Sequence, residues 1–272
     1  MRETVKKGGR RFLNISLIAL AIIFTMVYFF QEKLIFYSKT LPQEYQYQFE
    51  TKFEELFLTA EDGAVLNGLH FKVENPKGVI LYNHGNAGEL DSWGAWGETL
   101  AKRYHYDVVL WDYRGYGKSR GKRREELMLN DGLLFYNYCQ NLFPEDAITV
   151  YGRSLGGFFA THITKNNAPR RLILESTPTS LLEVAQETYP FIPAKWLLKF
   201  RFQNIENVSQ INIPTYLIHG TDDDLIPIEM GQRLYERSKA VEKYLHSIEG
   251  GNHNDLSNFE DPYFGALITI LE

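Results

Sequence analysis

The hydrophobic positions of this chain follow two different patterns. Residues 12–30 form a continuous apolar run of 19 residues without a charge, FLNISLIALAIIFTMVYFF. From residue 53 onward, short runs rich in Val, Ile, Leu and Tyr alternate with longer stretches in which apolar residues recur at helical spacing. This alternation predicts βαβ units, and strands that are apolar throughout are typical of a sheet covered on both faces.

The expected elements can be placed along the chain. Residues 52–59 and 65–73, separated by the turn signal Glu61-Asp62-Gly63, predict an antiparallel pair of strands. Six buried strands are then expected at residues 79–82, 108–111, 148–151, 172–174, 215–218 and 243–247. Helices are expected near residues 90–104, 124–142, 155–167, 229–239 and 257–271. The predicted fold class is therefore α/β, with a mostly parallel sheet covered by helices on both faces.

One stretch interrupts the alternation of strands and helices. Residues 177–212 contain three prolines and many aromatic residues, and they are too long for an ordinary connection. Two interpretations are open. The stretch is either a short cap inserted over a functional site or a pair of surface helices that close the core.

The apolar run at residues 12–30 has the length of a transmembrane helix. At about 1.5 Å per residue it extends roughly 28 Å, which is close to the hydrocarbon thickness of a bilayer. A cleaved signal peptide is the alternative, because Ala19-Leu20-Ala21 resembles a small-x-small cleavage site. That tripeptide lies in the middle of the run, which favours an uncleaved anchor.

Charge predicts the orientation of this anchor. Glu3 is the only acidic residue before the run, whereas five basic residues precede it: Arg2, Lys6, Lys7, Arg10 and Arg11. The positive-inside rule therefore places the N-terminus in the cytoplasm and the rest of the chain on the far side, in a periplasm or lumen. We expect an anchor unit at residues 1–37 and one globular domain at residues 38–272. An aromatic belt at the membrane interface is expected from Tyr28, Phe29, Phe30, Phe36 and Tyr37.

Composition excludes several classes of function. After the basic N-terminal segment, 24 basic and 33 acidic residues remain, a formal charge of −9. With no basic stripe in this part, nucleic acid is not expected as a partner. Cys139 is the only cysteine, so an intramolecular disulfide and a cysteine-based metal site are excluded, and the thiol is expected to be buried and inert.

The sequence around Ser154 indicates nucleophilic catalysis. Residues 148–151 form an apolar strand, Gly152-Arg153-Ser154-Leu155-Gly156 follows, and a helix is expected directly afterwards. A serine in a strained turn between strand and helix needs small residues two positions away on each side. The pattern predicts a nucleophile elbow, with Ser154 as the nucleophile.

A serine nucleophile requires a base and an acid, which should follow it in the chain in the order acid, then histidine. His253 lies in a glycine-rich loop after the last expected strand and is the predicted base. The acid should follow the preceding strand, where three aspartates stand together. We favour Asp223, and Asp222 and Asp224 remain open as alternatives.

An acyl-transfer site also needs N–H donors for the negatively charged oxygen of the intermediate. The strand at residues 79–82 leads into a glycine-containing turn, Asn83 to Gly88. The predicted donors are the backbone amides of Asn86 in this turn and of Leu155 after the nucleophile. His84 is expected to organise the turn by hydrogen bonding instead of acting as a base.

Taken together, these segments resemble the α/β-hydrolase superfamily. The likeness covers nearly the whole chain and includes Gln31 to Tyr37, Asn83 to Gly88, Asp112 to Ser119, the elbow, and Gly220 to Pro227 with His253-Asn254-Asp255. The single-pass branch that it resembles includes lysophospholipid lipases and protein depalmitoylases. This resemblance implies Asp223 as the acid and the amide of Asn86 as an oxyanion donor. For Asp255 it implies a brace for the histidine loop, with an N-cap of the last helix as the alternative.

The predicted function is hydrolysis of carboxylic esters or thioesters through an acyl-enzyme, without a metal or organic cofactor. A membrane anchor and an aromatic-rich cap favour small-molecule or lipid-like acyl substrates. Two alternatives remain: a small-peptide hydrolase of the serine aminopeptidase type, and a non-catalytic binding protein on the same fold.

Overall fold

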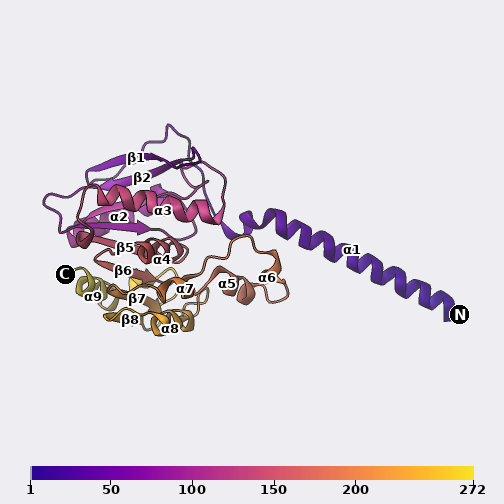
Figure 1. Cartoon of the computed structure of the whole chain (residues 1–272). Helices are drawn as coiled ribbons and strands as arrows, with labels where there is room; N and C mark the ends of the chain where they lie inside the picture. The colour runs from indigo at the N-terminus through magenta and orange to yellow at the C-terminus, as the bar shows by residue number, and fades with distance from the viewer. Residues whose placement is uncertain (1) are drawn as a thin grey trace.

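The computed structural model describes the backbone of residues 2–272 and the side chains from Asn14 onward. Helix α1 (Arg2–Ile35) projects from a body that contains the sheet and the remaining helices (Figure 1). The basic side chains from Arg2 to Arg11, which set the expected membrane orientation, lie outside the described side chains. That orientation and the boundary between residues 37 and 38 therefore stay predictions.

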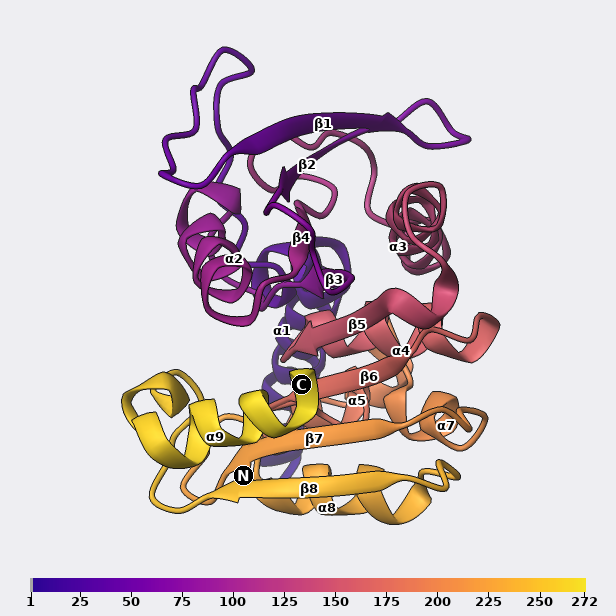
Figure 2. The same ribbon diagram turned by 90° about the vertical axis from the view of Figure 1, so that its left-hand side faces the viewer.

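The body is built on an eight-stranded sheet, within the described residues, in the order β1-β2-β4-β3-β5-β6-β7-β8 (Figure 2). The strands are β1 (Phe53–Thr59), β2 (Val65–Phe71), β3 (Val79–Asn83), β4 (Asp107–Trp111), β5 (Ile148–Arg153), β6 (Arg171–Glu175), β7 (Thr215–Gly220) and β8 (Lys243–Ile248). β2 pairs antiparallel with β1 and β4, and all other pairs are parallel. The predicted mostly parallel sheet is confirmed.

Helices cover both faces of this sheet, as predicted (Figure 2). One face is covered by α2 (Leu90–Tyr104) and α9 (Glu260–Leu271), whose apolar side chains share a core with β3, β4 and β7. The other face is covered by α3 (Glu125–Gln140), α4 (Gly156–Asn166) and α8 (Ile228–Arg237). Short 3-10 turns precede β5, at Glu145–Ala147, and α9, at Leu256–Asn258.

Two expectations about which residues are buried are wrong. β8 is not a buried strand, since it lies at the edge of the sheet and leaves Tyr244 53% exposed. Phe36 does not belong to an aromatic belt: it is 3% exposed and packs edge-to-face against Phe200, with ring centroids 5.0 Å apart. The belt residues Tyr28, Phe29, Phe30 and Tyr37 are exposed. An apolar side chain just after a spanning helix has two competing environments, and local sequence does not decide between them.

Residues 177–212 combine the two interpretations left open by the sequence. They form α5 (Leu181–Thr188), α6 (Ala194–Leu197) and α7 (Asn204–Val208). α7 packs against α4 and α8, and Phe202 stacks on Phe158 in the core, with ring centroids 5.0 Å apart. α5 and α6 instead extend toward the base of α1 (Figure 1). The second half of this stretch therefore closes the core, and the role of the first half as a cap over a site stays a prediction.

Helix α1 is long and apolar enough, over Asn14–Ile35, to cross a bilayer. Only a small share of this segment is buried against the rest of the chain. A soluble core helix would bury its apolar surface, so this exposure agrees with a membrane span. We describe it as a candidate anchor.

Candidate active site

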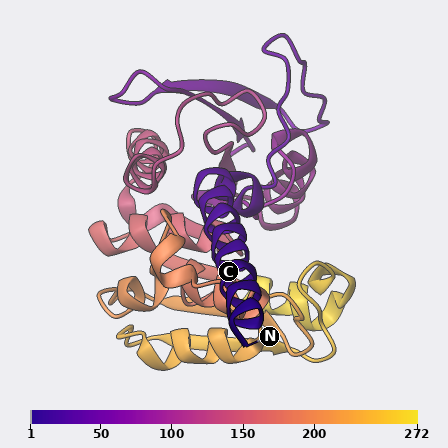
Figure 3. The same cartoon turned by 90° about the vertical axis from the view of Figure 1, so that its right-hand side faces the viewer.

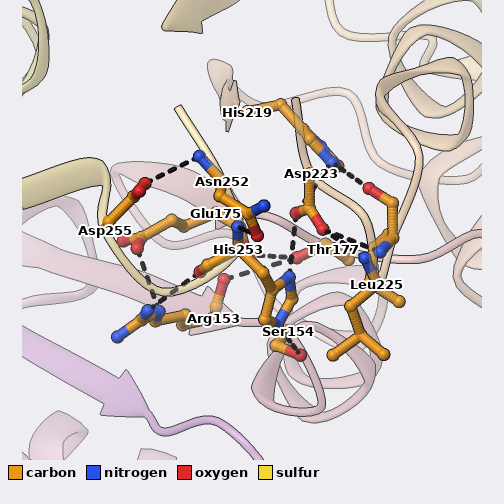
Figure 4. A network of polar contacts seen from close by, with 12 residues as sticks. Arg153, Ser154, Glu175, Thr177, His219, Asp223, Leu225, Asn252, His253 and Asp255 are labelled. Carbon is orange, nitrogen blue, oxygen red and sulfur yellow. Dashed lines mark hydrogen bonds and ion pairs between the residues drawn. The ribbon is translucent and has the colours of Figure 1, made fainter. Parts of the chain in front are cut away.

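Ser154 lies between β5 and α4, at the carboxyl end of a central strand. Its φ angle is +52°, a left-handed conformation that is costly for a serine. The backbone N–H of Ser154 donates to the carbonyl of Glu175 on the neighbouring strand, at 2.8 Å. The turn is therefore held in place by the sheet. In this position the Ser154 side chain lies beside the imidazole of His253 (Figure 4).

The glycines around Ser154 are required by close backbone contacts. A Cβ atom on Gly156 would lie 1.9 Å from the carbonyl oxygen of Asn83. On Gly152 it would lie 2.6 Å from the carbonyl oxygen of Gly156. Neither contact is possible without backbone movement, so β3, β5 and the start of α4 pack more closely than any residue with a side chain would allow.

Gly156→Ala is therefore expected to destabilise the protein by about 3 kcal/mol, because the new methyl group has to displace main-chain atoms. Gly265→Ala is the matched control, since a Cβ atom at Gly265 in α9 would meet no atom within 4 Å. The control should be neutral or stabilising by up to about 1 kcal/mol. Urea unfolding followed by tryptophan fluorescence measures both. Equal midpoints for the two variants would contradict the close packing at the elbow.

The structure brings Ser154, His253 and Asp223 together in one hydrogen-bonded chain (Figure 4). Nε2 of His253 lies 3.0 Å from Oγ of Ser154, and Nδ1 of His253 lies 2.8 Å from Oδ2 of Asp223. A carboxylate only accepts, so Nδ1 carries the proton and donates it. Nε2 is then the acceptor for the Ser154 hydroxyl, as a general base requires.

Among the three adjacent aspartates, Asp223 is the one in this chain. It is 5% exposed, and its Oδ1 accepts from the backbone amides of Leu225 and Ile226, at 3.1 and 2.8 Å. Asp222 and Asp224 are exposed, and the carboxylate of Asp222 accepts from the hydroxyl of Thr221. The position of the side chains thus favours the acid that the sequence favoured.

Asp223 is held in its charged form. Burial raises the pKa of its carboxyl, but the adjacent imidazole of His219 and the hydrogen bonds from His253 and from the amide of Ile226 outweigh burial and hold this pKa well below its ordinary value. His219 was not singled out in the sequence. Its Nε2 donates to the carbonyl of Ile226 at 2.8 Å and lies 3.5 Å from Oδ2 of Asp223. A permanently charged carboxylate stabilises the imidazolium that forms during acyl transfer.

Two further contacts position the histidine loop. Asn252 accepts from the backbone N–H of His253 at 2.6 Å, and Asp255 accepts from the backbone N–H of Asn252 at 2.6 Å. The N-cap position of the last helix, α9, is occupied by Phe259, so Asp255 does not cap that helix. Its hydrogen bond to Asn252 agrees with the loop brace that the family resemblance implied.

Arg153 and Glu175 form a second support that the sequence did not reveal. Arg153 donates to the backbone carbonyl of His253 at 3.1 Å, and its Nε lies 3.0 Å from Glu175. Glu175 is buried and also accepts from the hydroxyls of Tyr151 and Tyr263, at 2.5 and 2.9 Å. Arg153 occupies the variable position of the elbow motif. The sequence signal that could have revealed this support was Glu175, an acidic residue at the end of an apolar strand.

The predicted oxyanion donors lie next to Ser154. Asn86 and Leu155 line the same cavity as Ser154 and His253. The side chain of Asn86 accepts from the hydroxyl of Tyr116 at 2.7 Å, which fixes this part of the turn. His84 is buried and donates through Nδ1 to the carbonyl of Gly85 at 2.7 Å, as expected of a residue that organises the turn.

The cavity beside Ser154 has a volume of about 290 Å³. Its lining is mostly apolar and comes from the elbow, the Asn86 turn, the cap helix α5 and the end of α1. Phe158, Leu181 and Val184 are among the apolar side chains that face it. A site of this size and polarity fits an acyl chain better than a charged group.

Metal ligands and the single thiol are the remaining candidates for chemistry in the described residues. Among the described residues there is no cluster of three or more His, Cys, Asp or Glu side chains that could hold a metal ion. Cys139 is buried on α3, and burial raises the pKa of its thiol well above the ordinary value. A thiol in this state is a poor nucleophile, as the sequence predicted.

Sequence comparison identifies similar families and relatives. Residues 78–209 match the profile described as the alpha/beta hydrolase fold, and residues 194–260 match the serine aminopeptidase S33 profile. An uncharacterised protein of Mycobacterium tuberculosis is 28% identical over 89% of this chain and 86% of its own length.

Two animal proteins share part of their length with this chain. The lysophosphatidylserine lipase ABHD12 of Danio rerio is 32% identical over 58% of this chain and 46% of its own length. The human alpha/beta hydrolase domain-containing protein 17B is also 32% identical, over 67% of this chain and 62% of its own length. The chain thus spans less than two thirds of either animal relative.

Solved structures of esterases have the same fold. The esterase Pf2001 of Pyrococcus furiosus superposes with a TM-score of 0.67 at 19% identity, covering 86% of this chain and 96% of the esterase. Est1E of Butyrivibrio proteoclasticus, solved with ferulic acid bound, superposes with a TM-score of 0.65 at 19% identity, covering 80% and 100%. At this level of identity the likeness is one of fold.

Proposed function

Because this chain belongs to the α/β-hydrolase superfamily, we propose that it is a membrane-anchored serine hydrolase that cleaves carboxylic ester or thioester bonds. The observation that carries the proposal is the hydrogen-bonded chain from Ser154 through His253 to Asp223. This chain lies at the carboxyl end of the sheet and opens into an apolar cavity. A hydroxyl, an imidazole and a carboxylate in this order are the parts of an acyl-transfer site.

The mechanism has two steps. His253 takes the proton of Ser154 through Nε2 while Oγ attacks the carbonyl carbon, and the same proton then passes to the leaving alcohol or thiol. Water next attacks the acyl-enzyme with His253 again as the base, which releases the acid and restores Ser154. Asp223 holds the imidazole in the reactive tautomer and stabilises its positive form in both steps.

The negatively charged oxygen of each tetrahedral intermediate needs donors that are already in place. We assign this role to the backbone amides of Asn86 and Leu155. Leu155 stands at the N-cap position of α4, where the helix dipole also favours negative charge. Asn86 is held in its turn by the hydroxyl of Tyr116, which donates to its side chain.

The substrate class follows from the cavity and from the membrane helix. An apolar cavity beside Ser154 suits an acyl chain, and α1 would hold the site next to a bilayer. Phe191 and Trp196 are 97% and 81% exposed; Trp196 is part of α6, which contacts α1, and Phe191 lies just before this helix. The lysophosphatidylserine lipase among the relatives adds support for a lipid-like acyl substrate. We place the N-terminus in the cytoplasm and the hydrolase domain on the far side.

A second candidate function is hydrolysis of small peptides. The match of residues 194–260 to the serine aminopeptidase profile favours it. The same triad would serve, because amide and ester hydrolysis differ mainly in the leaving group. The cavity argues for the ester, since a peptide substrate with a free amino group needs an acidic partner that the apolar lining does not offer.

A fluorophosphonate probe tests the proposal directly, because it phosphonylates only an activated serine. The full-length protein in detergent should be labelled on Ser154 and should hydrolyse aryl esters and acyl thioesters faster than peptide amides. Ser154→Ala should lose both labelling and hydrolysis while its thermal unfolding stays close to that of the wild type. A wild-type protein that is neither labelled nor active on any ester would instead support the non-catalytic binding protein.

A further inference from the structure

Gln31 is an exception among the side chains of α1. It is 3% exposed, although it lies on a helix whose described side chains mostly face outward. Its Nε2 donates to the carbonyl of Leu197 at 3.0 Å, and its Oε1 accepts from the backbone N–H of Lys199 at 2.8 Å. An amide that satisfies both a donor and an acceptor of one segment joins the end of α1 firmly to the cap.

The residues that follow are joined to the predicted oxyanion turn. Nδ2 of Asn86 donates to the carbonyl of Ile35 at 2.6 Å, and Oδ1 of Asn86 accepts from the backbone N–H of Tyr37 at 3.2 Å. The same Oδ1 accepts from Tyr116. Asn86 is therefore fixed on one side by the body of the protein and on the other by the end of the anchor.

The end of α1 also forms part of the cavity. Leu34, Ile35 and Tyr37 line it together with Ser154 and His253. Leu34 and Tyr37 are 49% and 60% exposed, so they lie where the cavity meets the surface. Figure 3, which looks along α1 toward the body, shows the base of this helix centred on the body beneath it.

From these contacts we infer that residues 31–37 are a structural part of the acyl site and not only a link to the membrane. Leu34, Ile35 and Tyr37 of this segment form one wall of the cavity, and Leu34 and Ile35 determine which acyl chains fit. Gln31 is a positioning residue that holds the cap against this wall. The inference rests on the proposed function and adds the source of acyl-chain selectivity. The acyl chain enters beside the helix that leaves the bilayer.

A pair of substitutions in α1 tests this inference. Leu34→Trp places a larger side chain in the cavity wall, whereas Leu20→Trp makes the same change at a residue of similar exposure, 46%, that does not line the cavity. Both full-length variants are measured in detergent with aryl esters from acetyl to palmitoyl. Leu34→Trp should lower kcat/KM for decanoyl and longer esters about tenfold relative to acetyl ester, and Leu20→Trp should leave the profile unchanged.

The outcomes separate the inference from the proposed function. If the wild type hydrolyses no ester, the proposed function fails. If the wild type is active and the chain-length profile of Leu34→Trp equals that of Leu20→Trp, the inference fails alone. Leu34→Ala is a second test that still applies if the tryptophan variant does not fold. The smaller side chain widens the cavity and should shift the preferred acyl chain to a longer or branched one. An unchanged optimum in Leu34→Ala also counts against the inference.

Gln31→Leu tests the contact between anchor and cap. Loss of the two hydrogen bonds to the cap should raise KM for the decanoyl ester about tenfold, while kcat for the acetyl ester and probe labelling of Ser154 stay within about twofold of the wild type. A merely structural role would instead lower all activities together. Thr25→Val, which removes a hydroxyl bonded only within α1, is the control and should change neither constant.

Discussion

Replacing His253 with alanine is expected to lower kcat for ester hydrolysis by about six orders of magnitude. Without the imidazole, no group within hydrogen-bond distance of Ser154 in the described structure can accept the hydroxyl proton during attack. The same group also has to protonate the leaving alcohol, so both halves of the reaction are lost at once. Residual activity of about a thousandfold over water would come from the oxyanion donors and substrate binding alone.

His105→Asn is the matched control for His253→Ala. His105 is exposed at the C-terminal end of α2, and asparagine tolerates its left-handed backbone conformation. Steady-state hydrolysis of an aryl acetate, together with thermal unfolding of each variant, makes the comparison. If His253→Ala retains more than about a hundredth of the wild-type kcat, another base serves Ser154 and the assignment of His253 is wrong.

The order of the site residues along the chain is what made this site predictable. An elbow serine after one central strand, an aspartate after a later strand and a histidine after the last strand all lie at carboxyl ends of parallel strands. Because those ends meet at one edge of the sheet, distant positions converge without any knowledge of side-chain conformation. Sequence reasoning therefore reached Ser154, Asp223 and His253, and the structure brings them within hydrogen-bond distance.

Supporting contacts were not predictable in the same way. Arg153 and Glu175 come from adjacent strands, and their contact with the backbone of His253 depends on where a long side chain turns. The predictions for Phe36 and β8 were wrong for a related reason. The local sequence placed Phe36 in an aromatic belt and β8 among the buried strands, whereas Phe36 is buried in the body and β8 lies at the edge of the sheet. Tertiary position decides whether an apolar residue or strand faces a membrane, a core or the sheet edge.

The sequence did not predict that the end of the anchor contacts the site, because the chain reads as two separate units. A charge-free run followed by a globular pattern suggests two independent units, a tether at residues 1–37 and a domain at residues 38–272. Gln31 shows that the two units are joined. It is buried although it lies on an exposed helix, and its amide forms hydrogen bonds with the cap. Polar residues at the end of an apolar run are common at membrane interfaces, so the sequence offered no reason to place Gln31 inside the protein.

Asp223→Asn is expected to lower kcat by about four orders of magnitude, as the corresponding change does in serine proteases. An asparagine amide that donates toward Nδ1 of His253 favours the tautomer with the proton on Nε2. Nε2 then faces the hydroxyl of Ser154 as a donor and is unable to accept its proton. Asp222→Asn and Asp224→Asn each remove an exposed carboxylate next to Asp223 in the chain and should leave kcat within about twofold of the wild type. A fully active Asp223→Asn would transfer the role of the acid to one of these neighbours.

The same substitution has a pH signature in stability. Hydrogen bonds hold the pKa of Asp223 well below its ordinary value despite burial, so its charged form stabilises the folded state at neutral pH. This contribution is complete above the unfolded pKa of about 3.9 and is lost as the pH falls from there toward the lower pKa of the folded state. Asparagine has no such titration. The difference in unfolding free energy between wild type and Asp223→Asn, measured by urea unfolding, should therefore be largest near neutral pH and shrink below about pH 4. A difference that stays constant or grows with acid would mean that the Asp223 carboxylate is not stabilised by its histidine and amide partners.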